Sequence, residues 1–273
     1  MNSAAAPPVA AESGSGWYVY GVVPAAQVPA DTFAGAHGVH PSGDVVLVAD
    51  ADLAAIASDV PLAEFGERAI AENLHDAAWL EEKVRAHEAV LEAALARAPL
   101  VPFRFGTIYT SDDQVRRMLR ENSGLSETLE RLRGTFELGV KAFLDPEEFD
   151  RRHGGDSDAE EAEGGRAYLL RKQRDRQLAE ARSSFVAACA RDSHDRLAAA
   201  AEEGRANPLQ RPEVASHTGE MILNGAYLIS ASREGAFRDV VAALQSTHER
   251  DGVRYEVTGP WPAYNFVSAE QEL

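Results

Sequence analysis

The chain has 273 residues, of which 45% are apolar and 26% charged, and its net charge at pH 7 is −17. This length favours two domains, and the apolar content is sufficient for two hydrophobic cores. The negative charge argues against binding to nucleic acid or to an anionic membrane, since both select for lysine and arginine. The single cysteine, Cys189, excludes an intrachain disulfide and a cysteine-rich zinc site, so we expect a cytoplasmic protein.

The N-terminal region predicts a tail followed by three strands. Residues 1–16 are rich in Ala, Pro, Ser and Gly and are expected to be disordered, without the apolar run of a signal peptide. Aromatic and β-branched residues at 17–23 predict a strand. Residues 44–48 and 53–60 predict a hairpin. Residues 31–41 before it predict a loop, and the region 24–41 contains no convincing crossover helix. No stretch of the chain is long and apolar enough to span a bilayer.

Residues 74–97 predict the best helix in the sequence. Its apolar stripe is formed at spacings of four and three by Leu80, Val84, His87, Leu91 and Leu95. We expect His87 to be a buried, hydrogen-bonded histidine. It is followed by Glu88, but position 91 is not a histidine, so the zinc-protease pattern fails.

Residues 100–109 read Leu-Val-Pro-Phe-Arg-Phe-Gly-Thr-Ile-Tyr and predict the strand around which the first domain is built. Pro102 cannot donate a ladder hydrogen bond, so this end of the strand is expected at an edge. Arg104 is expected on the face opposite Phe103 and Phe105. Its structural role would be a salt bridge, and its functional role would be a contact with a partner.

Two further helices are predicted before the second domain. Ser111 and Gln114 form a capping box that begins a helix reaching to about Glu121. A shorter helix follows and ends at Gly134. We therefore place the domain boundary after Gly134.

The second domain begins with a predicted strand at 136–144, where apolar and polar residues alternate. An acidic stretch at 145–163 predicts a solvated loop, and we expect about 150–165 to be flexible. Its resemblance to a calcium loop fails because Glu161 stands where glycine is required. Residues 166–203 predict a long helix whose basic first half is expected to pair with the acidic loop. Nucleic-acid binding is disfavoured there because no aromatic residues interleave with the charges.

The chain then predicts a buried strand at 220–230, a helix capped by Ser232 and a strand at 253–258. The last segment reads Gly-Pro-Trp-Pro-Ala-Tyr-Asn-Phe-Val over 259–267. Two prolines bracket Trp261 and fix the direction of its indole. The aromatics of this segment either fold back over the core or present an apolar surface to a partner. We expect Trp261 in the core, and any partner contact on Tyr264 or Phe266.

Four motifs occur in an order that resembles one known family. They are Trp-Tyr-Val-Tyr-Gly at 17–21, Pro-Phe-Arg-Phe-Gly-Thr at 102–107, Asn-Gly-Ala-Tyr-Leu at 224–228, and the segment at 259–267. A helix carrying Ala-His-Glu-Ala-Val-Leu precedes the second motif. Over about 17–267 the chain resembles the GvpF/GvpL family of gas-vesicle proteins. The signature residues that carry this resemblance most directly are Phe103, Phe105, Gly106, Pro260, Trp261 and Pro262.

The resemblance implies an α+β fold with two domains. The N-terminal domain, 17–134, would be a ferredoxin-like variant. The C-terminal domain, 135–273, would be a modified ferredoxin-like unit with a long helix. Neither F-type nor L-type membership is distinguished by these motifs.

The same resemblance implies a minor structural component and assembly factor of gas vesicles. Such a protein would bind the hydrophobic major shell protein, of the GvpA type, and limit its aggregation. It would also contact other gas-vesicle accessory proteins and lie on the gas-facing side of the shell. We expect at least one of the strands at 100–109 and 221–230 to offer a sheet edge to a partner strand. The candidate partner-binding residues are Arg104, Tyr264 and Phe266.

Two other classes of function remain as alternatives. A small-molecule-binding or enzymatic ferredoxin-like protein is possible on fold alone. The sequence opposes it, because it has no phosphate loop, nucleophile elbow or clustered metal ligands, so we expect no cofactor, no metal and no catalytic residue. An RNA-binding module is opposed by the net charge and by the lack of its aromatic signature.

Overall fold

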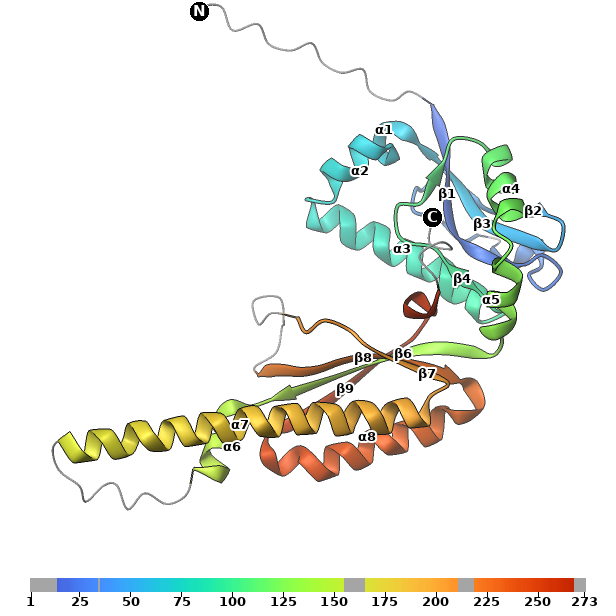
Figure 1. The fold of residues 1–273 in the computed structure, drawn as a ribbon. Helices are drawn as coiled ribbons and strands as arrows, with labels where there is room; N and C mark the ends of the chain where they lie inside the picture. Colours follow the sequence, from blue (N-terminus) through green and yellow to red (C-terminus); the bar gives the residue numbers. More distant parts are fainter. Residues whose placement is uncertain (1–13, 34, 155–164, 211–218, 268–273) are drawn as a thin grey trace, which may run out of the picture. The chain divides into compact units, whose positions relative to one another are not determined.

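The computed structural model describes residues 14–33, 35–154, 165–210 and 219–267 (Figure 1). The chain divides into two compact units. Unit 1 contains the residues up to Gly134 together with those from Pro262 onward, and unit 2 is Thr135–Trp261. The segment from Pro262 was expected in the C-terminal domain. It belongs to unit 1, where Tyr264 packs against the core. The expected tail lies outside the described residues except at its end, where the first strand already begins at Ser15.

Unit 1 is built on an antiparallel sheet with the strand order β2-β3-β1-β4, and β5 also pairs with β1. Its strands are β1 (Ser15–Pro24), β2 (Val45–Asp50), β3 (Leu53–Pro61), β4 (Val101–Pro102) and β5 (Ile108–Tyr109). The predicted hairpin is present as β2 and β3. Between β1 and β2 the described residues form only a short 3-10 helix, η1 (Ala30–Phe33), in place of a crossover helix. The sheet order therefore matches a ferredoxin-like unit that lacks its first helix.

The helices of unit 1 are α1 (Leu62–Phe65), α2 (Glu67–Asn73), α3 (Ala77–Leu95), α4 (Asp112–Glu121) and α5 (Leu125–Arg131). The long helix predicted from residue 74 begins three residues later, because the Asp76 side chain accepts hydrogen bonds from the amides of Ala78 and Trp79. Of the predicted stripe, His87 and Leu91 are fully buried, and they share the core-facing side with Lys83, Val90 and Ala94. The two short helices α1 and α2 were not predicted.

The predicted strand at 100–109 is interrupted. β4 and β5 each hold two residues, and residues 103–107 form a loop between them. Gly106 has a φ of +88°, which an extended strand does not allow. β1 holds both ends of the loop, since the Phe103 amide donates to the Tyr20 carbonyl and the Val19 amide to the Thr107 carbonyl. Pro102 lies in the last strand of the sheet order, as expected of an edge residue.

Unit 2 has an antiparallel sheet with the order β7-β8-β6-β9, and α7 and α8 cover one of its faces (Figure 1). Its strands are β6 (Thr135–Leu144), β7 (Glu203–Ala206), β8 (Glu220–Ser230) and β9 (Val253–Trp261). Its helices are α6 (Pro146–His153), α7 (Gly165–Ala200) and α8 (Glu234–His248), with the short 3-10 helices η3 (Ala231–Arg233) and η4 (Glu249–Asp251). The sequence β6-α7-β7-β8-α8-β9 is a ferredoxin-like βαββαβ unit, and α6 is an addition to it. The α+β class with two antiparallel sheets is thus confirmed.

Three local predictions in unit 2 were wrong or incomplete. The start of the acidic stretch is not a loop but the helix α6, whose N-cap Asp145 accepts from the amides of Glu147 and Glu148. Asp150, at the start of the segment expected to be flexible, accepts two hydrogen bonds from Arg182, and residues 155–164 lie outside the described part of the chain. Ser232 does not cap α8, since its hydroxyl bonds to that of Ser230.

Candidate functional site

Trp261 ends β9 and is exposed, with 36% of its surface accessible. The expectation that it lies in the core is wrong. β9 runs three residues beyond the predicted strand, and it is the last strand in the sheet order, so a side chain at its end has few neighbours. Pro260, beside it, is exposed as well, whereas Pro262 is buried.

Tyr264 and Phe266 belong to η5 (Tyr264–Phe266) in unit 1. Phe266 is 1% exposed, and its carbonyl accepts a hydrogen bond from Arg131. A side chain this deeply buried offers no surface to a partner, so the assignment of Phe266 as a partner contact is corrected. Tyr264 is half-buried and packs against the core of unit 1.

His87 joins this C-terminal segment to the rest of unit 1. Its Nδ1 lies 2.9 Å from the Tyr18 hydroxyl, and its Nε2 lies 3.1 Å from the Tyr264 hydroxyl. Tyr264 donates to Glu88 Oε1 at 2.9 Å, so its oxygen accepts the proton on His87 Nε2. Nδ1 then accepts from Tyr18, which in turn accepts from the Gly106 amide at 3.1 Å. The prediction of a buried, hydrogen-bonded histidine is confirmed.

Burial sets the protonation states of this cluster. Desolvation lowers the pKa of His87 from 6.5 to about 4, so the ring is neutral at pH 7. Desolvation raises the pKa of Glu88, although the bond from Tyr264 opposes the shift. Burial likewise raises the pKa of Tyr18. The two tyrosine hydroxyls, His87 and Glu88 Oε1 bind one another, and these bonds position the loop at Gly106 and the segment at Tyr264. The other carboxylate oxygen, Glu88 Oε2, is buried and has no hydrogen-bond partner among the described residues.

The signature residues in the loop at 103–107 have different structural roles. Phe103 is fully buried, and the half-buried Phe105 ring stands edge-on to Tyr18 and Trp79 at centroid distances of 6.0 and 6.2 Å. Gly106 supplies the left-handed backbone of the turn. Arg104 is exposed between these residues, pointing away from the core.

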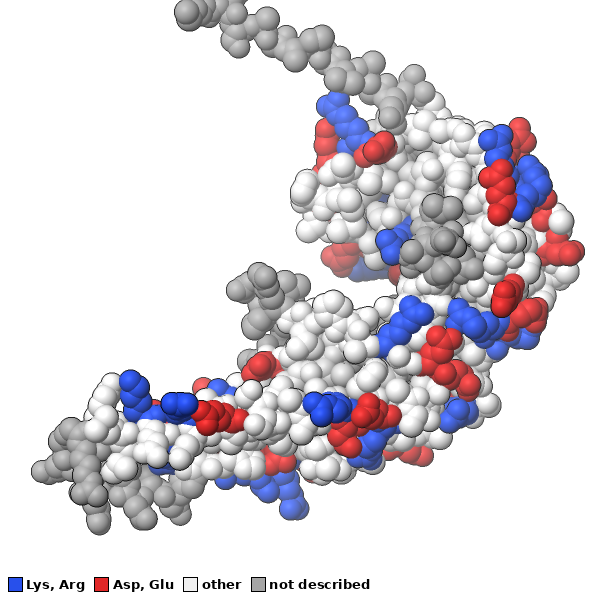
Figure 2. Space-filling view, viewed as in Figure 1, with Lys and Arg blue, Asp and Glu red and all other residues white. Residues whose placement is uncertain are grey.

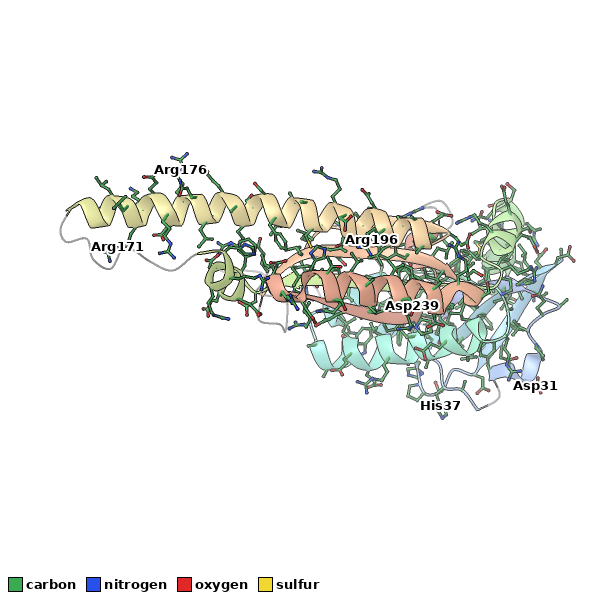
Figure 3. All side chains as sticks on the ribbon, turned by 90° about the horizontal axis from the view of Figure 1, so that it is seen from below. Asp31, His37, Arg171, Arg176, Arg196 and Asp239 are labelled. Atoms are coloured by element: carbon green, nitrogen blue, oxygen red, sulfur yellow. The ribbon has the colours of Figure 1, made fainter. Side chains whose placement is uncertain are left out.

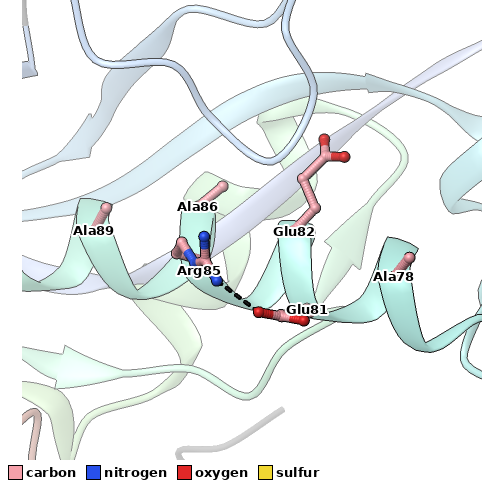
Figure 4. Close-up of a pocket in the computed structure, with 6 residues that line it drawn as sticks. All are labelled: Ala78, Glu81, Glu82, Arg85, Ala86 and Ala89. Atoms are coloured by element: carbon pink, nitrogen blue, oxygen red, sulfur yellow. Dashed lines mark hydrogen bonds and ion pairs between the residues drawn. The ribbon is translucent and has the colours of Figure 1, made fainter.

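A hollow of about 450 Å³ lies on the surface of α3 (Figure 4). It is lined by Ala78, Glu81, Glu82, Arg85, Ala86 and Ala89. Its charged groups pair along the helix, because Arg85 binds Glu81 at 2.6 Å and Glu82 binds Lys83 at 3.0 Å. The hollow therefore has no convergent polar groups of the kind that orient a small ligand.

Within the described ranges no three His, Cys, Asp or Glu residues are grouped so as to hold a metal ion. His37 lies on the surface (Figure 3), and His40 binds Ser42 and faces Glu64 at 3.7 Å. Cys189 is buried, and desolvation raises the pKa of its thiol, which makes it a poor nucleophile. In the same described part of the chain, no helix is long and apolar enough to cross a membrane.

Charges of both signs are mixed along α7 on the face visible in Figure 2. Arg176 pairs with Glu180 of the same helix, and Arg171 and Arg176 project from different sides of its first half (Figure 3). Arg174 donates to the Gly154 carbonyl, just after α6. The basic half of α7 thus contacts the end of α6, in keeping with a structural role. Beside these charges, Tyr168, Leu169 and Leu170 are exposed at 62%, 65% and 43%.

The two strands expected to offer a sheet edge are poorly suited to it. β8 lies between β7 and β6, so both of its sides are paired. β4 is an edge strand, but Pro102 provides no donor there. The edge strands of the unit 2 sheet are instead β7 and β9, and β9 pairs with β6 on one side. Sequence reasoning missed this edge because the topology decides which strand is last.

Comparison with known proteins gives the family. The family model described as gas vesicle synthesis protein GvpL/GvpF matches residues 16–268. Gas vesicle protein L of Streptomyces sp. (strain CB03234) is 31% identical over 240 residues, covering 87% of this chain and 88% of that protein. Gas vesicle protein F of the same organism is 29% identical over 260 residues, covering 92% and 98%. The crystal structure of GvpF from Anabaena sp. PCC7120 shares the fold, with a TM-score of 0.64 at 20% identity over 93% of this chain and 96% of that one. The chain therefore belongs to the GvpL/GvpF family of gas vesicle proteins.

Proposed function

We propose that this chain is a minor structural component and assembly factor of gas vesicles, which binds the hydrophobic major shell protein and limits its aggregation during vesicle formation. Membership of the GvpL/GvpF family supports the gas-vesicle role. The exposed indole of Trp261 is the observation that carries the binding role. Other gas-vesicle accessory proteins are further proposed partners.

Trp261 has the properties of an interface anchor. Its side chain is large and apolar with one polar tip, and tryptophan is enriched at binding hot spots. Pro260 and Pro262 restrict the backbone on both sides, so little further conformational entropy is lost when a partner binds. We therefore favour the insertion of the exposed Trp261 indole into an apolar pocket of a partner over a role in folding.

A protein of this composition can also keep an aggregating partner in solution. Hydrophobic strands with unpaired edges recruit one another, and covering them blocks that association. The net charge of −17 keeps the resulting complex soluble through mutual repulsion. The proposal includes no catalytic step. A place on the gas-facing side of the shell remains a prediction, which immunolabelling of intact and opened vesicles tests.

The variant Trp261→Ala tests the binding role. We expect its melting temperature to stay within about 2 °C of the wild type, since an exposed side chain contributes little to folding. Its retention of the shell protein in a pull-down should fall at least tenfold, as for an anchor worth about 2 kcal/mol. More shell protein should then enter the insoluble fraction on co-expression.

Tyr168→Ala is the matched control, because it removes another exposed aromatic from the same unit. It should leave both melting temperature and binding unchanged. Wild-type retention of the shell protein by Trp261→Ala would contradict the proposed anchor. A fall in melting temperature with binding intact would return Trp261 to a structural role.

A further inference from the structure

The outer edge of β9 is closed at its beginning by a side chain of α8. Gln245 Oε1 accepts from the Tyr255 amide at 2.9 Å, and Gln245 Nε2 donates to the Val253 carbonyl at 3.2 Å. The Gln245 amide thus takes the place that a neighbouring strand would occupy. It also shows that the backbone groups of Val253 and Tyr255 point away from β6.

Beyond Gln245 the edge is open. Because successive residues of a strand point to opposite sides, Val257 and Gly259 also face outward. The open groups are the Tyr255 carbonyl, the Val257 amide and carbonyl, and the Gly259 amide. No described residue bonds to them, and Pro260 ends the run because it has no amide proton.

From Tyr255 to Gly259 the opening holds no lysine or proline, although a bulge and Pro260 follow directly. Lysines, inward charges or prolines normally discourage pairing at such edges. Between Tyr255 and Gly259 the sole charged residue is Glu256, and its carboxylate is paired with Arg254 at 3.2 Å. The segment 255–259 is closed by Gln245 at its start and by Pro260 at its end. It is therefore suited to a partner strand that pairs over these five residues alone.

We propose that a second copy of this chain occupies the edge, with β9 pairing antiparallel to β9 of the other copy about a two-fold axis at Val257. The open groups are symmetric about this residue. Val257 of each copy would donate to and accept from Val257 of the other. The Gly259 amide of each copy would donate to the Tyr255 carbonyl of the other, so every open group finds a partner.

Two further features fit a second copy. In a regular ladder the Tyr255 amide would donate to the Gly259 carbonyl of the other copy. Here the Tyr255 amide already donates to Gln245, so that ladder bond does not form. The φ of +108° at Gly259 turns that carbonyl out of the extended ladder direction, so it needs no such donor. Glu256 would face Thr258 of the other copy, which places a hydroxyl and not a like charge beside the carboxylate. Such a self-complementary patch is what a two-fold interface requires.

The oligomeric state of the full chain, without any shell protein, tests this pairing. We expect light scattering to give about twice the chain mass of 29.5 kDa. In a Cys189→Ser background, the double variant Glu256→Cys/Thr258→Cys should form a covalent dimer on mild oxidation. Directly opposed non-hydrogen-bonded pairs have Cα atoms about 4.5 Å apart, within disulfide reach.

The single variants are the matched controls. In Glu256→Cys or Thr258→Cys alone, the cysteines of the two copies occupy the same position and lie diagonally across the strand pair, roughly 7–8 Å apart. Each single variant should therefore cross-link weakly. A mixture of the two single variants should restore the covalent dimer. Val257→Pro removes the central amide donor and should give a monomer whose circular dichroism matches the wild type.

Three results would overturn the proposal. They are a monomer at all concentrations, a double variant that cross-links no better than the singles, and a Val257→Pro protein that folds but stays dimeric. The chain could also be monomeric alone, with the β9 edge protected from hydrogen exchange only after shell protein is added. That result would overturn the dimer and assign the edge to a strand of the shell protein. Because the dimer test omits the shell protein, its failure is distinct from a failure of the Trp261 test.

Discussion

At the scale of single residues, His87 has a structural role that goes beyond apolar packing. It is 1% exposed, and through Tyr18 and Tyr264 it links β1 to the C-terminal segment. Each of these groups is buried or half-buried, so the loss of one leaves its partner without a hydrogen bond at a cost of about 1–3 kcal/mol. The free energy of unfolding of unit 1 therefore depends on His87 remaining neutral.

A dependence of stability on pH follows from the low pKa of His87. The folded pKa of about 4 lies below the ordinary value of 6.5, so the unfolded chain binds the proton more tightly. This contribution is fully present above pH 6.5 and is lost as pH falls toward 4. At pH 5 it should have decreased by about 2 kcal/mol. Glu88 acts in the opposite sense, because its raised pKa favours the folded state when it is protonated.

Urea unfolding at pH 7 and pH 5 measures this effect. His87→Gln should lower the free energy of unfolding at pH 7, yet it should lose about 2 kcal/mol less than the wild type between the two pH values. Exposed carboxylates titrate equally in both proteins and cancel in the comparison. Equal losses in wild type and His87→Gln would show that His87 does not carry the pH dependence.

At the scale of elements, the sequence predicted those with a strong pattern. The strands β1, β3, β6 and β8 and the helices α3, α4 and α7 were expected within a few residues of their bounds. β7 was missed because its sequence, Glu-Gly-Arg-Ala, has no apolar alternation and its pairing with β8 alone makes it a strand. The region at 100–109 was misread because alternation reports the directions of side chains and not whether the backbone remains in a ladder.

The helix α6 shows what a cap contributes where composition indicates a loop. Asp145 accepts from two amides of the first turn, at 2.9 and 3.1 Å, and Pro146 is favourable at the first helical position. We expect Asp145→Ala to lower the free energy of unfolding by about 1 kcal/mol. Asp175→Ala, an exposed acid within α7, is the control and should change it by less than about 0.5 kcal/mol. Equal effects of the two variants would rule out capping as the cause.

At the scale of the whole molecule, the path of the chain was the part least accessible from sequence. His87 and Tyr264 are 177 positions apart, and no local pattern indicates that they meet. The motif at 259–267 indicated the family, but the predicted burial of its aromatic residues was wrong. Trp261, expected in the core, is exposed, and Phe266, expected as a partner contact, is buried. Burial of an aromatic depends on which core it reaches, and here the chain leaves unit 2 after Trp261 and ends in unit 1.

That path predicts which unit depends on the C-terminal segment. Phe266→Ala removes a ring that is 1% exposed, and it should cost about 3–5 kcal/mol. Because Phe266 belongs to unit 1, the loss should be confined there. Hydrogen exchange should then accelerate in β1 and α3, while β6 and β8 keep their protection.

Phe237→Ala is the matched control, since this ring is fully buried in the core of unit 2. It should produce the reverse pattern, with faster exchange in β6 and β8 and unchanged protection in β1 and α3. Equal acceleration in both units by either variant would mean that the two units unfold as one cooperative block. The C-terminal segment would then stabilise the whole chain, and its position in unit 1 would have no separate energetic consequence.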